Sequence, residues 1–133
     1  MMEKLEGKTV LIVDDDARNT FALSNYLETL SMKVIIAGDG QEAISLLQNS
    51  IKPDIILLDM MMPVMDGYET LAVLKQDLSL QKICVIAVTA RAMKGDRERC
   101  MEAGAHDYIS KPIDTKVLID KITQWIIYNE FRQ

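Results

Sequence analysis

The sequence predicts an α/β fold in which a doubly wound sheet of five parallel strands has helices on both faces. Apolar runs of four to six residues alternate along the chain with longer segments of helical period, a pattern typical of parallel strands buried on both faces. The 133 residues are expected to form a single domain with an ordered core at about 9–128. Right-handed crossovers and the common strand order 2-1-3-4-5 then place strands one and three side by side.

The first half of the chain supplies three of the predicted strands and two of the helices. They are a strand at 9–13, a helix at 18–30, a strand at 33–37, a helix at 41–49 and a strand at 55–59. The first helix carries its apolar residues on one side, as an amphipathic helix does. The sequence Gly38-Asp39-Gly40 indicates a turn, and Pro53 separates the second helix from the third strand.

The second half begins with a loop at 60–67 that contains Pro63 and the turn pair Asp66-Gly67. The elements that follow are a helix at 68–76, a strand at 83–89, a charged helix at 94–103, a strand at 107–110 and a helix from 115 to about 128. Asp114 is in position to cap this last helix. The charged helix contains an internal glycine, which lowers helix stability, and we expect it to be among the less stable elements.

Composition excludes several classes of protein. The net charge of -5 and the pI near 4.8 argue against a general affinity for nucleic acid or anionic membranes. No apolar stretch approaches the ~20 residues of a membrane span, and the N-terminus does not look like a signal peptide. A cytoplasmic protein is therefore expected. Cys84 and Cys100 lack metal-ligand spacing and are predicted to be reduced core residues.

Four strands end in polar residues whose side chains suit one chemistry. Asp14 and Asp15 follow the first strand and Asp59 ends the third, while Thr89 ends the fourth and Lys111 follows the fifth. In an open parallel sheet, ligands bind outside the carboxyl ends of the strands, where the strand order reverses. Acids, a hydroxyl and a lysine at that edge predict a site for a divalent cation and a phosphoryl group.

Crowded carboxylates repel one another, and a shared proton or a bound cation relieves the repulsion. A few hard oxygen ligands suit Mg²⁺, or Mn²⁺ in its place. Lys111 can neutralise Asp59 and then pair with an incoming phosphoryl oxygen. Because Asp59 is the single acid on its strand, whereas Asp14 and Asp15 form a pair suited to the metal, Asp59 is the best candidate for an acceptor that forms an aspartyl-phosphate.

The segments VLIVDDD, DIILLDMMMPVMDGYE, VIAVTA and GAHDYISKPI together resemble the receiver domains of two-component response regulators, over about Thr9 to Tyr128. The resemblance implies a flavodoxin-like (βα)5 fold and phosphorylation of Asp59 by a phosphohistidine on a histidine kinase or a histidine phosphotransfer protein. It implies a signalling module for a downstream protein target rather than an enzyme, with only self-catalysed phosphorylation and autodephosphorylation.

The resemblance also implies roles for individual residues. Asp15 would be a direct Mg²⁺ ligand and Asp14 would act largely through water, with a further ligand from the backbone carbonyl of Met61. Thr89 and Tyr108 look like a switch pair. Lys111 looks like the phosphate-binding lysine, in a cis peptide bond with the proline that follows it.

An interaction face follows from the same resemblance. The charged helix, the last strand and the last helix would form the contact surface, in a monomer or a weak homodimer, with contributions from exposed Ile119, Ile127 or Phe131. We also hypothesise that the charged helix rearranges on phosphorylation. Met61 and Arg91, each two residues beyond a site residue, are hypothesised to set the lifetime of the phosphoryl group.

Simpler interpretations remain for several of these residues. The acidic run 14–16 can cap the helix after it, and Asp16 is expected to do only that. Asp59 and Lys111 can pair for stability alone. Tyr108 can be a plain core residue, and His106 is expected to be a solvated loop histidine. The methionines at 60–62 and 65 suit either a docking surface or gap filling.

Three other functions compete with the receiver. An aspartate-nucleophile phosphatase needs an acid two residues after the nucleophile, where this chain has Met61. A flavin carrier would bring its phosphate to the loop after strand one, where the acidic run would repel it. A phosphorylation-independent scaffold stays open, as does the choice between a free-standing regulator and the receiver of a hybrid histidine kinase.

Overall fold

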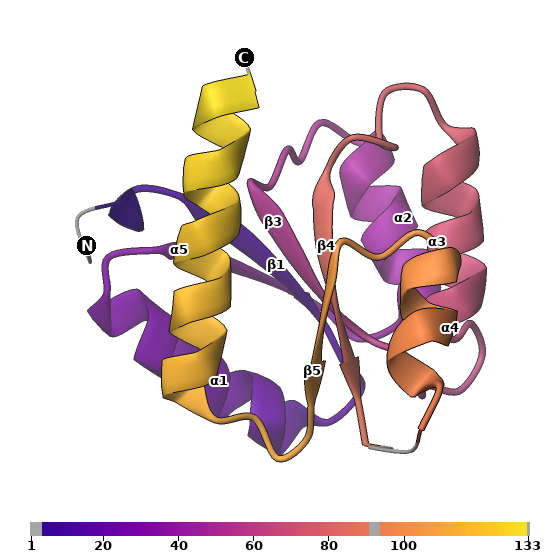
Figure 1. Cartoon of the computed structure of the whole chain (residues 1–133), viewed down its shortest axis with the longest axis horizontal. Coiled ribbons are helices and arrows are strands. Elements are labelled where there is room, and N and C mark those ends of the chain that lie inside the picture. The colour runs from indigo at the N-terminus through magenta and orange to yellow at the C-terminus, as the bar shows by residue number, and fades with distance from the viewer. Residues whose placement is uncertain (1–3, 91–93, 133) are drawn as a thin grey trace.

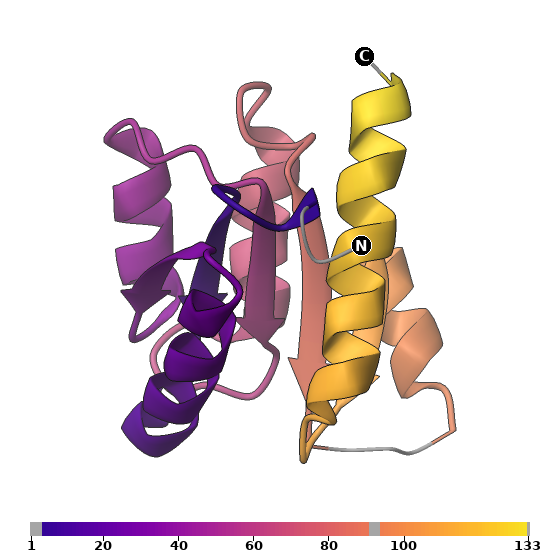
Figure 2. The same cartoon turned by 90° about the vertical axis from the view of Figure 1, so that its left-hand side faces the viewer.

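A computed structural model of the chain, described here for residues 4–90 and 94–132, contains a parallel five-stranded sheet (Figure 1). Its strands are β1 (Thr9–Val13), β2 (Lys33–Ala37), β3 (Ile55–Asp59), β4 (Cys84–Thr89) and β5 (Asp107–Ser110). They lie side by side in the order β2-β1-β3-β4-β5. The predicted fold class and strand order are confirmed. The carboxyl ends of β1 and β3 therefore lie next to each other, at the carboxyl edge of the sheet. In Figure 2 this edge is at the bottom, where the arrows of β3 and β4 end.

The helices are α1 (Ala17–Thr29), α2 (Gly40–Gln48), α3 (Gly67–Gln76), α4 (Asp96–Glu102) and α5 (Thr115–Arg132). The predicted end of α5 at Tyr128 is wrong, because the helix continues for another turn. No glycine or proline interrupts the sequence there. The carboxylate of Glu130, in the last turn, forms ion pairs with Nζ of Lys4 at 3.4 Å and Nζ of Lys8 at 3.8 Å. None of the helices in the described ranges has the length and apolar character that crossing a membrane requires.

Helices cover both faces of the sheet (Figures 1 and 2), and each face carries its own apolar core. Alternate residues of each central strand point to opposite faces, as Leu57 and Leu58 of β3 do. One core packs against α1 and α5, and the other against α2, α3 and α4. Cys84 lies in the first core and Cys100 in the second, both buried and unbridged as predicted. Ile119 is buried as well, so its predicted exposure is wrong, whereas Phe131 is exposed.

Aspartates cap four of the helices that start at the carboxyl edge of the sheet, and Asp114 caps α5 as predicted by accepting from the Lys116 amide at 2.9 Å. Asp16 accepts hydrogen bonds from the first backbone amides of α1, which confirms its predicted role. Asp39 caps α2, and Asp66 forms a reciprocal capping box with Glu69 at the start of α3. Each cap contributes about 1 kcal/mol to helix stability. The caps therefore fix the loops that surround the strand ends.

The segment before β5 is tied to β4 by His106, which lies in a loop as predicted but is half-buried and hydrogen-bonded rather than solvated. The Val85 amide donates to Nδ1 of His106 at 3.1 Å, and the His106 amide donates to the Val85 carbonyl at 2.8 Å. The next residue, Asp107, accepts hydrogen bonds from Trp125 and Lys121 of α5. Burial alone would raise the pKa of Asp107, but these donors outweigh burial and hold that pKa below its usual range.

Candidate functional site

The pairing of β1 with β3 brings three predicted acids together at the carboxyl edge of the sheet. Val13 is in register with Leu58, so Asp14 and Asp59 occupy the next positions on two adjacent strands. One carboxylate oxygen from each of Asp14, Asp15 and Asp59 lies within 4.8 Å of the other two. Asp14 and Asp59 are buried, whereas Asp15 is exposed. The cluster thus consists of two buried carboxylates and one carboxylate that is exposed to solvent.

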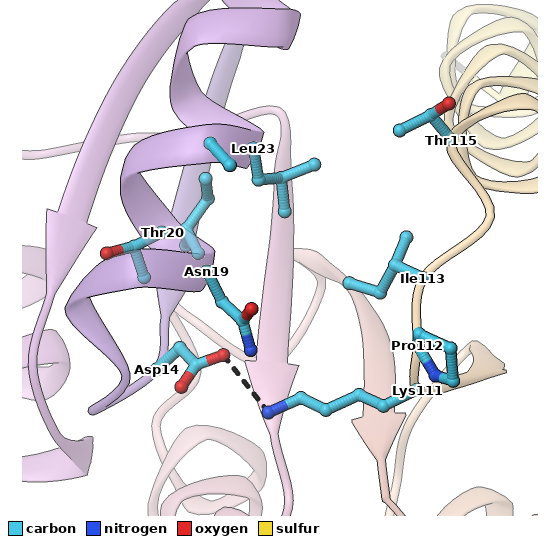
Figure 3. A pocket seen from close by; sticks show the side chains of 10 residues that line it. Asp14, Asn19, Thr20, Leu23, Lys111, Pro112, Ile113 and Thr115 are labelled. Atoms are coloured by element: carbon cyan, nitrogen blue, oxygen red, sulfur yellow. Dashed lines mark ion pairs between the residues drawn. The ribbon is translucent and has the colours of Figure 1, made fainter.

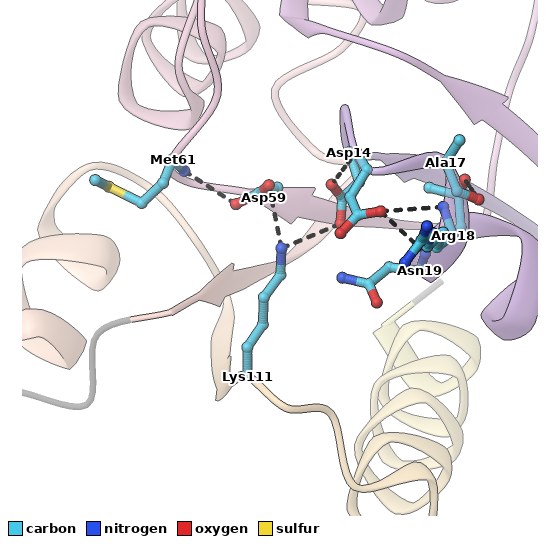
Figure 4. A network of polar contacts seen from close by, with 9 residues as sticks. Asp14, Ala17, Arg18, Asn19, Asp59, Met61 and Lys111 are labelled. Carbon is cyan, nitrogen blue, oxygen red and sulfur yellow. Dashed lines mark hydrogen bonds and ion pairs between the residues drawn. The ribbon is translucent and has the colours of Figure 1, made fainter.

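Lys111 bridges the two buried acids (Figure 4). Its Nζ lies 3.3 Å from Oδ2 of Asp14 and 3.3 Å from Oδ2 of Asp59. The Lys111 backbone amide donates to the Thr89 carbonyl at 2.7 Å, so the pairing of β4 with β5 positions this side chain. The peptide bond from Lys111 to Pro112 is cis, as the family resemblance implied. The structure therefore assembles the predicted acids and the predicted lysine from three different strand ends.

Backbone amides hold the remaining oxygens of the two buried acids (Figure 4). Oδ1 of Asp14 accepts from the Asp16 amide at 2.9 Å, and Oδ1 of Asp59 accepts from the Met61 amide at 3.0 Å. Each carboxylate consequently has one oxygen fixed by the backbone and one facing the lysine. The sequence predicted a role for the Met61 carbonyl but did not reveal this contact from its amide, which depends on the turn after β3.

The electrostatics of the cluster favour a bound cation. Burial, followed by repulsion from Asp14, raises the pKa of Asp59, although the Met61 amide and Lys111 oppose the shift. Burial would lower the pKa of Lys111, but Asp14 and Asp59 outweigh it and raise that pKa above its ordinary value. Among the described residues, the contacts of the cluster set three carboxylates against one ammonium, which leaves an excess of negative charge. Hard oxygen donors with such an excess fit a divalent cation such as Mg²⁺.

Thr89 lies on β4, the strand next to β3, and Tyr108 lies on β5, the strand beyond it. Thr89 is buried at the end of β4, one position beyond Val88, which is in register with Asp59. Tyr108 of β5 is in register with Ala87 of β4. Its half-buried side chain packs against the core beneath α2, α3 and α4. Burial raises the pKa of the Tyr108 hydroxyl, and the nearby charge of Asp96 adds to this effect. Tyr108 therefore packs partly in the core while remaining close to α4.

Of the methionines that follow Asp59, some fill gaps in the core, and one is exposed where it can contribute to a docking surface. Met60 and Met62 are buried in the core and fill space. The Met61 side chain is 50% exposed beside the site, so it is accessible to solvent and to a partner. Arg91, the other residue hypothesised to control phosphoryl lifetime, lies outside the described residues.

A cavity of about 490 Å³ opens beside the ion pair of Asp14 and Lys111 (Figure 3). It lies between α1, which contributes Leu23, and the segment after Lys111, which contributes Ile113 (Figure 3). The remaining lining residues are Ile12, Asn19, Thr20, Ala22, Pro112 and Thr115. The sequence does not reveal this cavity, because its width depends on the distance between α1 and the segment after β5.

Comparisons with known proteins agree with this geometry. The model of the response regulator receiver domain family matches residues 10–123. The polar-differentiation response regulator DivK of Brucella anthropi is 40% identical over 119 residues, which cover 90% of this chain and 96% of DivK. The receiver domain of the sensor histidine kinase PA1611 of Pseudomonas aeruginosa, solved with a magnesium ion coordinated in its active-site cleft, is 32% identical with a TM-score of 0.82. That match covers 90% of this chain and 98% of the other.

A further similar structure is a complex. The receiver domain of the Saccharomyces cerevisiae response regulator Ssk1 was solved with the histidine phosphotransfer protein Ypd1. This structure is 25% identical to the chain, with a TM-score of 0.84, and the match covers 94% of this chain and 92% of the other.

Proposed function

The chain belongs to the family of response regulator receiver domains of two-component signalling, and on this premise we propose that Asp59 is its phosphoacceptor. The observation that carries the proposal is the position of Lys111, whose Nζ lies 3.3 Å from both Asp14 and Asp59. An ammonium in that position balances the acids at rest and is placed to pair with a phosphoryl oxygen bound to Asp59.

The reaction is a transfer of a phosphoryl group between two side chains. The P–N bond of a phosphohistidine breaks, a P–O bond to a carboxylate oxygen of Asp59 forms, and the released imidazole takes up a proton. The Met61 amide orients the carboxylate by holding its Oδ1 at 3.0 Å. The raised pKa of Lys111 keeps the ammonium charged throughout the physiological range.

Asp14, Asp15 and Asp59 are the residues that would hold Mg²⁺ or Mn²⁺, with the carbonyl of Met61 as a further ligand. When bound, the cation supplies positive charge that offsets the charge of the transferred group. The magnesium ion in the similar receiver of PA1611 supports this assignment. Without a cation, Lys111 and two backbone amides face the negative charge of three carboxylates, so transfer is expected to be slow.

Phosphorylation is proposed to act on other proteins through a switch. Thr89 and Tyr108 are the switch pair, and the face of α4, β5 and α5 contacts a downstream target or, weakly, a second copy. The donor is a histidine kinase or a histidine phosphotransfer protein, which the Ypd1 complex of the similar Ssk1 receiver supports. We place the module in the cytoplasm and assign it no metabolite turnover and no direct contact with nucleic acid or membrane.

Incubation with acetyl phosphate and Mg²⁺ is expected to add one phosphoryl group to the wild-type chain, as measured by intact mass. Asp59→Asn and removal of the metal with a chelator are each expected to abolish the adduct. Asp54→Asn is the matched control, because Asp54 precedes β3 at its opposite end, where it accepts from the Thr9 amide. An unchanged adduct on Asp59→Asn, or none on the wild type, would overturn the proposal.

Met61→Asn is expected to shorten the life of the phosphoryl group without preventing its formation. The Met61 side chain is half exposed beside Asp59, and an amide there can hold the attacking water where a thioether shields it. We expect decay about tenfold faster, equivalent to about 1.4 kcal/mol of barrier. Loss of ³²P from purified phosphoprotein measures this rate. Leu78→Asn, an exposed apolar position outside the site, is the control, and equal decay rates in the two variants would refute the prediction.

A further inference from the structure

The first residue of α3 packs directly on the end of the acceptor strand. A Cβ atom on Gly67 would lie 2.6 Å from Cα of Met60 and 2.9 Å from the carbonyl oxygen of Asp59. The Gly67 amide also donates to the Met60 carbonyl at 3.3 Å. Backbone thus lies against backbone at these two contacts, and the Met60 thioether packs beside them with its Sδ 2.5 Å from the same Cβ position. A displacement at the end of β3 must therefore reach α3.

The next residue, Tyr68, extends from α3 to α4. Its hydroxyl lies 3.7 Å from Sγ of Cys100, which is fully buried. The guanidinium of Arg99, the neighbouring residue on α4, lies 5.1 Å from the centre of the Tyr68 ring. A cation over the face of an aromatic ring is attracted by the negative charge of that face. One side chain of α3 therefore contacts two consecutive residues of α4.

α4 is poorly anchored by its own sequence. It has seven residues, and Gly95, which the sequence predicted inside the helix, instead precedes it without forming a side-chain cap. Asp96, in its first turn, is buried, and its Oδ1 lies 3.9 Å from a guanidinium nitrogen of Arg99. The charge of Asp96 adds to burial in raising the pKa of both Tyr68 and Tyr108. The position of this short helix consequently depends on contacts from α3 on one side and β5 on the other (Figure 1).

We propose that Tyr68 is a positioning residue that couples Asp59 to α4 through α3. A group added to Asp59 shifts the end of β3, the shift passes to Gly67 by direct contact, and Tyr68 passes it to Cys100 and Arg99. This route is separate from the switch pair Thr89 and Tyr108. The inference rests on the proposed function, because it gives the phosphorylation site a second connection to its output face. Coupling between two sites is reciprocal, so a change at Tyr68 must also alter binding at Asp59.

The test uses beryllofluoride with Mg²⁺ as a phosphate mimic and measures two quantities in the full chain. These are hydrogen exchange at the amides of 96–102, with and without the mimic, and the affinity of the mimic. In the wild type the mimic is expected to change exchange across α4. Tyr68→Leu, which fills similar space without a ring or hydroxyl, is expected to lose at least half of that change and to shift the affinity about fivefold.

Two further variants sharpen the test. Tyr68→Phe keeps the ring over Arg99 and loses the contact with the thiol, so an intermediate response is expected. Tyr26→Leu, a half-buried tyrosine on α1 at the opposite face of the sheet, is expected to respond like the wild type. If the mimic changed hydrogen exchange across α4 in Tyr68→Leu as much as in the wild type, or if Tyr26→Leu lost as much of that change as Tyr68→Leu, the inference would be overturned. The proposed function would not be affected by either result. Failure of the wild type to bind the mimic would instead overturn the proposed function.

Discussion

Replacement of Lys111 by methionine is expected to destabilise the fold by about 3 kcal/mol at neutral pH. Lys111 lies 3.3 Å from a carboxylate oxygen of both Asp14 and Asp59, and those two acids are buried. Methionine has a similar length and an apolar end, so the variant keeps most of the packing and removes the charge. It leaves two buried carboxylates facing each other without compensation, which is the costly way to break a buried ion pair.

The pH dependence of this loss follows from the pKa directions. The pKa of Lys111 is raised, so its contribution is complete below about pH 10, where the unfolded lysine is also charged, and is lost as pH rises through its folded value. The pKa of Asp59 is raised, so its ionisation costs stability as pH rises from about 4 through its folded value. The defect of Lys111→Met is therefore expected to shrink as pH falls toward 4 and Asp59 takes up a proton.

Urea denaturation at pH 7 measures the loss of stability, and the same measurement at about pH 4.5 shows how far the loss decreases. Lys52→Met, at an exposed lysine, is the matched control and is expected to stay within about 0.5 kcal/mol of the wild type. The double variant Lys111→Met/Asp59→Asn is expected to recover a large part of the loss, because it removes one of the two uncompensated charges. Equal stability of Lys111→Met and the control would show that Asp14 and Asp59 do not need the lysine in the fold.

The ionised Asp59 therefore reduces the stability of the domain while it builds the site. A neutral side chain at Asp59 would relieve the repulsion from Asp14, yet it would remove the acceptor. Natural proteins commonly retain such a cost at functional sites. In this chain the cost is offset locally by Lys111 and by the backbone amides of Asp16 and Met61.

The sheet and the acidic cluster could be predicted because both depend on local sequence. Buried parallel strands appear as apolar runs, and parallel pairing brings their polar ends to one edge whatever the detailed packing. Asp16 could be assigned as a cap because capping needs only the residues that follow it. The strand order was not determined by the residues alone, since it relied on the commonest arrangement for five βα units.

Other features could not be predicted because they depend on contacts between distant segments. The role of His106 requires the amide and carbonyl of Val85 beside it, which are supplied by a strand 21 residues away in sequence. The last turn of α5 extends beyond the apolar pattern, and Glu130 there meets lysines from the other end of the chain. The cavity beside Lys111 likewise depends on the distance between α1 and the segment after β5, which the hydrophobic periodicity of the sequence does not reveal.

Gly67→Val is expected to destabilise the domain by about 3 kcal/mol or more, as severe overpacking of a filled site does. A Cβ atom at this position would lie 2.5 Å from Sδ of Met60, 2.6 Å from Cα of Met60 and 2.9 Å from the carbonyl oxygen of Asp59. The Met60 thioether can move, but the two backbone atoms cannot move without displacing the end of β3. The acceptor itself must then shift, so phosphorylation by acetyl phosphate is expected to fall even in the fraction that remains folded.

Gly38→Ala provides the matched control, because the atom nearest to its added Cβ is a carboxylate oxygen of Glu42 at an ordinary 3.8 Å. It is expected to change stability by no more than about 0.5 kcal/mol. Urea midpoints give the stability of both variants, and intact mass gives their phosphoryl content after correction for the folded fraction. If Gly67→Val folded and accepted phosphate as well as the control, the backbone of α3 would not press on the acceptor strand. The route from Asp59 through Tyr68 to α4 would then lose its first step.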